Sequence, residues 1–123
     1  MTVRSVRPIL NVSDVRESLA WFEQLGWKTT FVWDDEGGEP EFGGTGSGDD
    51  AEIFLCRNGQ GERPTWVSWF LDELAEVDRL HARAVELGLD VVRAPADEPW
   101  GVREFRLRHP EGHTFRVGAF IGG

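Results

Sequence analysis

The sequence predicts an α+β fold in which one unit, a strand followed by a helix and three more strands (βαβββ), occurs twice. The first observation is an internal repeat, because Leu25-Gly26-Trp27 and Leu87-Gly88-Leu89 end two helical patterns at equivalent places. The second is a β-hairpin pattern over 102–117, where apolar residues alternate on both sides of a Pro-Glu-Gly turn. We therefore expect a single domain over 1–123, with one module over about 1–60 and the other over about 61–123.

The first half predicts an amphipathic helix between strands. Ser13 or Asp14 is the expected N-cap, and Glu17 is placed to complete a capping box. Gly26 ends the helical pattern. One helical face is apolar and should be buried against the sheet; its residues are Val15, Ser18, Leu19, Phe22 and Leu25. The strands predicted in this half are 6–12, 27–33, about 40–44 and 51–57.

The second half predicts the same order of elements. Asp72 is the expected N-cap of its helix, and Gly88 follows the last helical turn. The face expected to be buried consists of Leu74, Val77, His81, Ala84 and Val85. The strands predicted in this half are 65–71, 89–93, 101–108 and 113–120.

Composition and charge exclude several classes of partner. The 123 residues carry 13 basic and 22 acidic side chains, so the formal net charge is −9. This charge disfavours nucleic acid and anionic membranes as partners and favours a cationic ligand. No apolar run is long enough for a membrane span, and no secretory signal is visible. The single cysteine, Cys56, cannot form an internal disulfide, which is typical of a protein of the reducing cytoplasm.

Acidic residues concentrate between positions 34 and 52, a segment without lysine or arginine. One interpretation is a solvated loop, and the other is a negatively charged rim on a binding groove. The aromatic residues Trp33, Phe42 and Phe54, which lie within or beside the segment, favour the rim. The carboxylates concerned are Asp34, Asp35, Glu36, Glu39, Glu41, Asp49, Asp50 and Glu52.

No pattern in the sequence indicates a nucleophile, a phosphate site or a cofactor. The glycine-rich segment 43–48 lacks the lysine and the strand-to-helix context of a phosphate-binding loop, so we expect a flexible connection or lid. His109 and His113 flank the final turn and are expected to be turn and rim residues. His81 lies on the buried face of the second helix, and Cys56 is expected to be an inert buried thiol.

Short motifs along almost the whole chain resemble the vicinal oxygen chelate superfamily, which includes glyoxalase I, extradiol dioxygenases, fosfomycin-modifying enzymes and bleomycin-resistance proteins. The resemblance implies the glyoxalase/bleomycin resistance fold, in which two βαβββ modules pair their curled sheets around a ligand-binding cleft. The motifs are Pro8-Ile9-Leu10-Asn11-Val12-Ser13-Asp14, Ser18-Leu19-Ala20-Trp21-Phe22, Leu25-Gly26-Trp27, Trp100-Gly101 and Pro110-Glu111-Gly112.

Metal enzymes of this superfamily take His or Glu ligands from the first and last strand of each module. The matching positions here are Arg7, Phe54, Trp66 and Arg116. None of these side chains offers a donor suited to a divalent cation. A shift of one residue would bring Glu52 or Glu104 near, but it would reverse the faces of the strand and could not restore all four sites. The resemblance therefore implies a cleft without a metal.

Strand alternation predicts an aromatic and acidic lining for this cleft. Aromatic faces bind flat rings and cations, and nearby carboxylates add an attraction that weakens with salt. For each single tryptophan, packing in the core is the alternative role. The candidate ligand-binding residues are Trp33, Asp34, Phe42, Glu52, Phe54, Trp66, Ser68, Trp100 and Glu104, and no catalytic residue is assigned.

Within the superfamily, the chain resembles the bleomycin-resistance proteins most, through segments 98–101, 103–105, 107–108 and 72–74, through the acid-rich middle segment, and through Pro8 and Pro110. Those proteins are small, acidic, metal-free dimers that sequester a cationic antibiotic without turnover, in grooves at the dimer interface. In that family the proline matched by Pro8 lets the first strand cross to the partner subunit; a strand-edge proline is the alternative.

The resulting hypothesis is a cytoplasmic homodimer that binds a cationic or flat aromatic antibiotic, most similar in type to bleomycin. One alternative is a lyase, isomerase or dioxygenase of the same fold, with a metal site elsewhere or an acid–base pair of Glu104 with Arg7 or Arg116. Another alternative is an interaction domain whose cleft is filled by the protein's own side chains.

Overall fold

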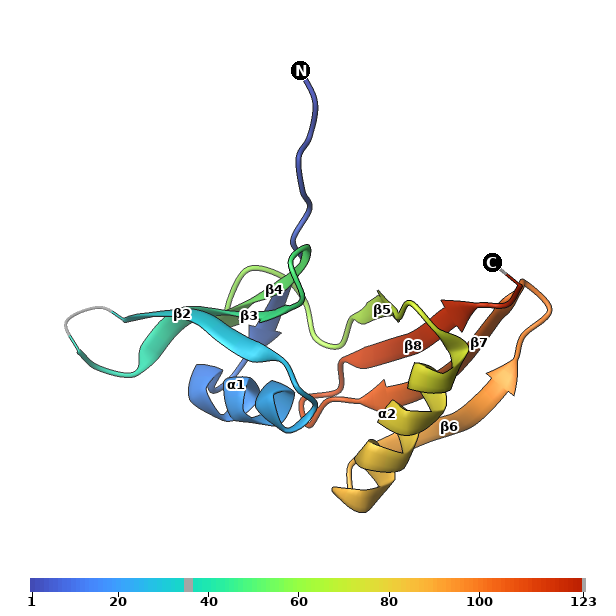
Figure 1. Cartoon of the computed structure of the whole chain (residues 1–123). Helices are drawn as coiled ribbons and strands as arrows, with labels where there is room; N and C mark the ends of the chain where they lie inside the picture. Colours follow the sequence, from blue (N-terminus) through green and yellow to red (C-terminus); the bar gives the residue numbers. More distant parts are fainter. Residues whose placement is uncertain (35–36, 123) are drawn as a thin grey trace. The chain divides into compact units, whose positions relative to one another are not determined.

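The computed structural model describes residues 1–34 and 37–122, which form two compact units, Met1–Arg63 and Pro64–Gly123. Each unit consists of a four-stranded mixed sheet and one helix (Figure 1). The α+β fold with two βαβββ modules, predicted from the repeat and the hairpin pattern, is therefore confirmed. No described helix has the length and apolar character needed to cross a membrane.

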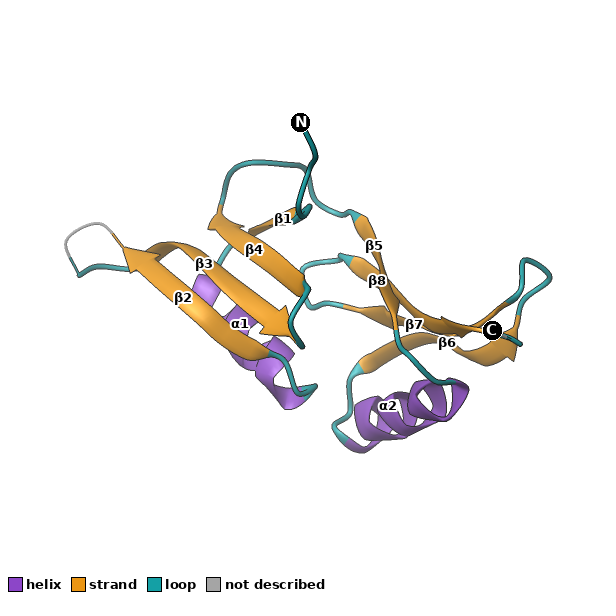
Figure 2. Cartoon of the chain, turned by 45° about the horizontal axis from the view of Figure 1, so that its top comes forward, coloured by secondary structure: helices purple, strands orange, loops and turns teal. Residues whose placement is uncertain are grey.

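The first unit has the strand order β1-β4-β3-β2, with β1 parallel to β4 and the other neighbours antiparallel. Helix α1 lies against one face of this sheet (Figure 2). Its elements are β1 (Ile9–Val12), α1 (Val15–Gln24), β2 (Lys28–Asp34), β3 (Pro40–Ser47) and β4 (Ala51–Arg57).

Helix α1 follows the predicted capping and amphipathic pattern. Asp14 is the N-cap, and its Oδ1 accepts a hydrogen bond from the Glu17 backbone N–H at 2.9 Å. Val15, Leu19 and Phe22 are buried at 5 % exposure or less, so the predicted apolar face is the one that packs on the sheet. The other sheet face is left for the aromatic residues described below.

The second unit repeats this topology with the strand order β5-β8-β7-β6, in which β5 is parallel to β8. The predicted β7–β8 hairpin is present, and Phe105, Leu107, Phe115 and Val117 are fully buried on its inner face. The elements are β5 (Trp66–Phe70), α2 (Leu74–Glu86), β6 (Asp90–Asp97), β7 (Val102–Arg108) and β8 (Thr114–Phe120).

Several element boundaries differ from the sequence prediction. Strand β1 begins at Ile9 instead of residue 6, and the pairing starts where the Pro8 carbonyl accepts from the Phe54 N–H at 2.9 Å. The N-cap of α2 is Glu73, not Asp72, and it makes no side-chain capping bond. Strand β6 continues past residue 93 despite Pro95, because β6 is an edge strand and shifts register there.

The glycine-rich segment is part of a strand, so the prediction of a flexible connection or lid over 43–48 was wrong for residues 43–47. These residues belong to β3 and pair with β2 and β4. A Cβ atom on Gly44 would lie 2.5 Å from the Phe31 ring, and one on Gly43 would lie 2.9 Å from Val15 Cγ1. Glycine is needed here because side chains approach the strand closely on both faces.

The two histidines of the final turn are buried, which corrects their expected place at the rim. His109 is 2 % exposed and His113 is fully buried. The Nδ1 atom of His109 accepts from the Glu111 N–H at 3.1 Å, and that of His113 accepts from the Thr65 N–H at 3.1 Å. Both rings therefore act as hydrogen-bond acceptors that fix the β7–β8 turn and the start of β5. Burial, with a smaller contribution from the neighbouring His113, lowers the pKa of His109 to about 4.

Candidate functional site

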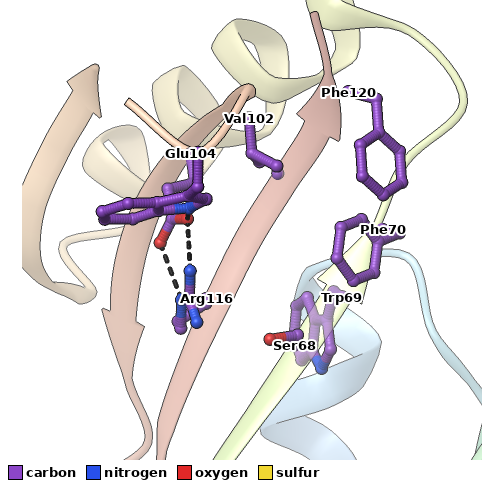
Figure 3. A pocket seen from close by; sticks show the side chains of 9 residues that line it. Ser68, Trp69, Phe70, Val102, Glu104, Arg116 and Phe120 are labelled. Carbon is purple, nitrogen blue, oxygen red and sulfur yellow. Dashed lines mark hydrogen bonds and ion pairs between the residues drawn. The ribbon is translucent and has the colours of Figure 1, made fainter. Parts of the chain in front are cut away.

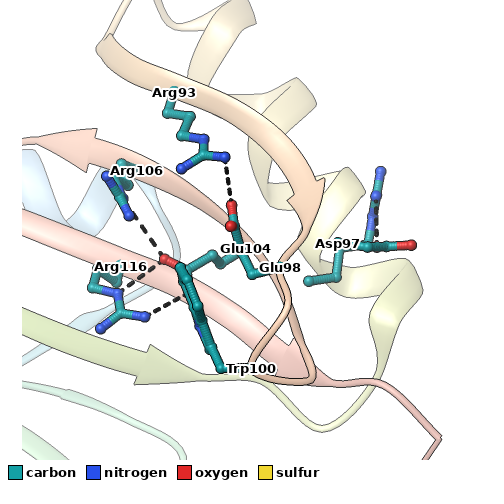
Figure 4. A network of polar contacts seen from close by, with 8 residues as sticks. Arg93, Asp97, Glu98, Trp100, Glu104, Arg106 and Arg116 are labelled. Carbon is teal, nitrogen blue, oxygen red and sulfur yellow. Dashed lines mark hydrogen bonds and ion pairs between the residues drawn. The ribbon is translucent and has the colours of Figure 1, made fainter.

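A buried carboxylate in the second unit is held by an arginine from the neighbouring strand. Glu104, on β7, is 2 % exposed. Its Oε2 accepts from Arg116 Nε at 2.9 Å, and its Oε1 accepts from Arg116 Nη2 at 2.7 Å (Figure 4). The Trp100 indole N–H also donates to Oε1 at 3.1 Å, and Arg106 Nε lies 3.7 Å from Oε2. These four residues, Trp100, Glu104, Arg106 and Arg116, are called the Glu104 cluster below.

The electrostatics of the Glu104 cluster keep its carboxylate ionised. The hydrogen bonds from Arg116 lower the pKa of Glu104, and this effect outweighs the opposing effect of burial. The hydrogen bonds to Glu104 in turn raise the pKa of Arg116. Each arginine also lies against an exposed indole ring, with Arg116 5.5 Å from the centre of Trp100 and Arg106 5.7 Å from that of Trp66.

A pocket of about 230 Å³ lies beside the Glu104 cluster, within the second unit (Figure 3). One side is polar, with Glu104 and Arg116, and the other carries two exposed phenylalanines. Phe70 and Phe120 stack with their ring centres 4.9 Å apart and an interplanar angle of 8°. We call this pair the phenylalanine stack. The full lining consists of Ser68, Trp69, Phe70, Trp100, Val102, Glu104, Arg116, Gly118 and Phe120.

The first unit carries a second arginine–carboxylate pair beside aromatic rings. Glu52 accepts hydrogen bonds from Thr30 Oγ1 at 2.6 Å and from Arg7 Nε. These two hydrogen bonds lower the pKa of Glu52, and the bond from Thr30 has the larger effect. The Arg7 guanidinium lies 6.0 Å from the centre of the Phe54 ring. The Phe54 ring centre lies 5.5 Å from that of Phe31 and 5.4 Å from that of Phe42, and Phe31 and Phe42 stack at 5.8 Å.

The predicted site residues fall into two groups, one in each unit. Ser68, Trp100 and Glu104 line the pocket of the second unit, whereas Trp66 is not a lining residue and lies under the Arg106 guanidinium. In the first unit, Phe42, Glu52 and Phe54 form the cluster just described, and Trp33 is the exposed cross-strand partner of Phe42. Asp34 has a local role, because its Oδ1 accepts from the Gly37 N–H at 2.6 Å in the turn after β2.

The acid-rich segment is more structured than a solvated loop. Glu41 and Glu52 belong to strands β3 and β4 and form ion pairs with Arg57 and Arg7. Asp35 and Glu36 lie outside the described residues. Since its strand carboxylates already have arginine partners, the segment offers less direct attraction to a cation than its composition suggests.

Several residues that contribute to these surfaces were not among the candidate site residues. Arg106 and Arg116 were not counted as ligand contacts, because Arg116 was considered only at a metal-ligand position and as a partner of Glu104 in an acid–base pair. Phe31 and Phe120 could have been found from strand alternation, since Phe31 is two positions from Trp33 and Phe120 is two positions from Gly118 on the pocket side of β8. The register that sets Arg106 opposite Arg116 comes only from the structure.

The residues at the four metal-ligand positions do not fit a divalent cation. Arg7 and Arg116 are cationic and are bound to Glu52 and Glu104, while Phe54 and Trp66 offer no suitable lone pair. Among residues 1–34 and 37–122, no three His, Cys, Asp or Glu side chains gather in a way that could hold a metal ion. We therefore derive no chemistry that passes through a metal.

Comparison with known proteins places this architecture among solved structures. TioX from Micromonospora sp. ML1 matches with a TM-score of 0.82 and 20 % identity over 97 % of this chain and 100 % of that chain. A glyoxalase-related enzyme from Clostridium phytofermentans matches with a TM-score of 0.81 and 25 % identity over 98 % of both chains. A bleomycin-binding protein complexed with bleomycin matches with a TM-score of 0.68 and 22 % identity over 95 % of this chain and 98 % of that chain.

No functionally curated protein is significantly similar to this sequence. At the family level the match is extensive, because residues 4–117 fit the profile described as the Glyoxalase/Bleomycin resistance protein/Dioxygenase superfamily. This chain therefore belongs to the glyoxalase/bleomycin resistance protein/dioxygenase superfamily.

Proposed function

We propose that this protein binds and sequesters a flat aromatic or cationic antibiotic, or a similar natural product, of the bleomycin type, without a metal and without chemical turnover. The observation that carries the proposal is the pocket of the second unit. There Arg116, at a position where metal enzymes of the fold have a ligand, is bound to Glu104 beside exposed aromatic rings. The similar structure of a bleomycin-binding protein complexed with bleomycin supports the same type of ligand.

The functional form in this proposal is a cytoplasmic homodimer with the ligand groove at the dimer interface. Support comes from the apolar surface of the second unit, where Phe70 and Phe120 are 58 % and 60 % exposed and Trp100 and Ile121 are also exposed. Large exposed apolar residues grouped in this way favour a surface that a partner or a ligand covers. Sedimentation analysis tests the dimer, and a monomer at all concentrations would contradict this part of the proposal.

The test of ligand binding is a calorimetric titration with bleomycin at low salt. We expect saturable binding, and we expect Phe70→Ala to weaken it at least twofold, because Phe70 lines the pocket and one aromatic contact contributes roughly 0.5–2 kcal/mol. Val92→Ala is the matched control, since Val92 is also exposed and apolar but lies outside the pocket, and it should bind like the wild type. Absence of heat with the folded protein would remove bleomycin as the ligand.

The alternative is a lyase, isomerase or dioxygenase of the same superfamily, which the similarity to a glyoxalase-related enzyme favours. The acid–base pair considered for it, Glu104 with Arg116, is hydrogen-bonded in the structure, whereas Arg7 is bound to Glu52. The lowered pKa of Glu104 makes this carboxylate a weak base at neutral pH. Recovery of bleomycin with unchanged mass and unchanged chromatographic retention after incubation is the expected result, and a product that differs in either property would favour the enzyme.

A further inference from the structure

We infer that the pocket of the second unit binds a carboxylate carried by a flat aromatic ligand. This inference rests on the proposed binding function and deepens it, because it names the group that the ligand presents to the Glu104 cluster. It runs against the overall charge of −9, which favours cations. Three features support it: the local charge is positive, the arginines have unused hydrogen-bond donors, and aromatic surfaces lie beside these arginines.

The local charge of the Glu104 cluster is positive. Arg106 and Arg116 are direct cross-strand partners on β7 and β8 (Figure 4). Two like charges in this arrangement repel each other unless anions lie between them. Among the described residues, Glu104 is the single carboxylate that both arginines approach, so one positive charge is left uncompensated. The nearby Arg93 does not add to this surplus, because it forms its own ion pair with Glu98 at 2.8 Å.

The arginines also keep hydrogen-bond donors for a second anion. A guanidinium has five N–H groups, and Arg116 uses one from Nε and one from Nη2 to hold Glu104. The buried Nε atom of Arg106 makes no hydrogen bond to a described residue, and its 3.7 Å approach to Glu104 is too long for one. Glu104, by contrast, already accepts three hydrogen bonds. The cluster therefore needs an acceptor, and a planar carboxylate is the acceptor that matches a guanidinium best.

The remaining contacts favour a carboxylate that is attached to a ring. Ser68 is the cross-strand neighbour of Arg116 on β5 and lines the same pocket, so its hydroxyl is a further donor. Opposite the charged side, the phenylalanine stack presents exposed apolar surface (Figure 3). A flat aromatic acid can satisfy both sides at once, because its ring covers the phenylalanines while its carboxylate meets the Arg116 guanidinium.

The test compares three probes of equal size by calorimetry: 2-naphthoate, 2-naphthamide and 2-naphthylmethylammonium. We expect 2-naphthoate to bind at least tenfold more tightly than 2-naphthamide, and the ammonium compound to bind most weakly. Arg106→Gln should reduce the preference for the acid, because it removes the surplus positive charge beside Arg116, and it should leave the affinity for the amide unchanged, because Arg106 does not line the pocket. This variant retains the Glu104–Arg116 pair, so it is the safer choice for folding than a change of Arg116.

Arg108→Gln is the matched control, because Arg108 is an exposed arginine at the end of the same strand that pairs with Asp90 and takes no part in the Glu104 cluster. It should retain the preference for the acid. Equal binding of acid and amide, or tighter binding of the ammonium compound, would overturn the inference and leave aromatic binding in place. Failure of all three probes to bind would overturn it as well, and the bleomycin titration decides the proposed function separately.

Discussion

Glu104→Gln is expected to lower the free energy of unfolding by about 2 kcal/mol, because it leaves two arginines without their shared counter-ion. Glu104 is 2 % exposed and its ionised form accepts hydrogen bonds from Arg116 and Trp100. The amide keeps the size of the side chain, but it has one acceptor oxygen and no charge. Arg116 retains partial access to water, so the loss should be smaller than for a fully buried ion pair. Urea unfolding followed by tryptophan fluorescence measures the change.

The matched control for this prediction is Glu41→Gln. Glu41 also forms an ion pair with an arginine, Arg57, but both side chains are about a third or more exposed. Exposed pairs contribute little to stability, so the expected change is below about 1 kcal/mol. Equal losses in the two variants would show that burial gives the Glu104 pair no special role, contrary to this account.

Acidification from pH 7 to pH 5 is expected to lower the free energy of unfolding by about 2 kcal/mol through His109 alone. Burial lowers the pKa of this ring from 6.5 to about 4, so the folded state stays neutral while the unfolded chain takes up a proton. The contribution of His109 is therefore fully present above pH 6.5 and is lost as the pH falls toward 4. Protonation of His109 in the folded protein would also place a buried positive charge next to His113.

The pH dependence is measured by urea unfolding at several values between pH 7 and pH 5. His109→Asn should flatten the dependence, because the amide oxygen can still accept from the Glu111 N–H but does not titrate in this range. The control is His81→Asn, a residue on α2 that is only partly buried and packs edge-on against Phe105. If the His109 variant keeps the wild-type slope, another group is responsible for it.

The sequence predicted best those features that depend on local patterns. The β7–β8 hairpin follows from period-two alternation, and α1 follows from an Asp cap and one apolar face. The glycines of β3 were misjudged because their reason is tertiary: Phe31 and Val15 approach the strand from opposite faces. The burial of His109 and His113 was missed for a similar reason, since polar residues beside a turn are usually solvated.

The candidate site was predicted in its residue types but not in its charge balance. Glu52 and Glu104 were expected to attract a cation, yet each is bound to an arginine. Glu104 and Arg116 are twelve positions apart in sequence and meet only through the register of β7 and β8. A shift of that register by one residue would place these side chains on opposite faces of the sheet, so composition alone cannot give the pairing.

The central claim of this account is that arginine–carboxylate pairs and aromatic rings have replaced metal ligands in this chain. The most direct test is elemental analysis of the folded, full-length protein after dialysis against zinc, nickel and iron salts. The account predicts far less than one equivalent of each metal per chain, because Arg7, Phe54, Trp66 and Arg116 offer no suitable donors. One tightly held metal ion per chain would contradict it.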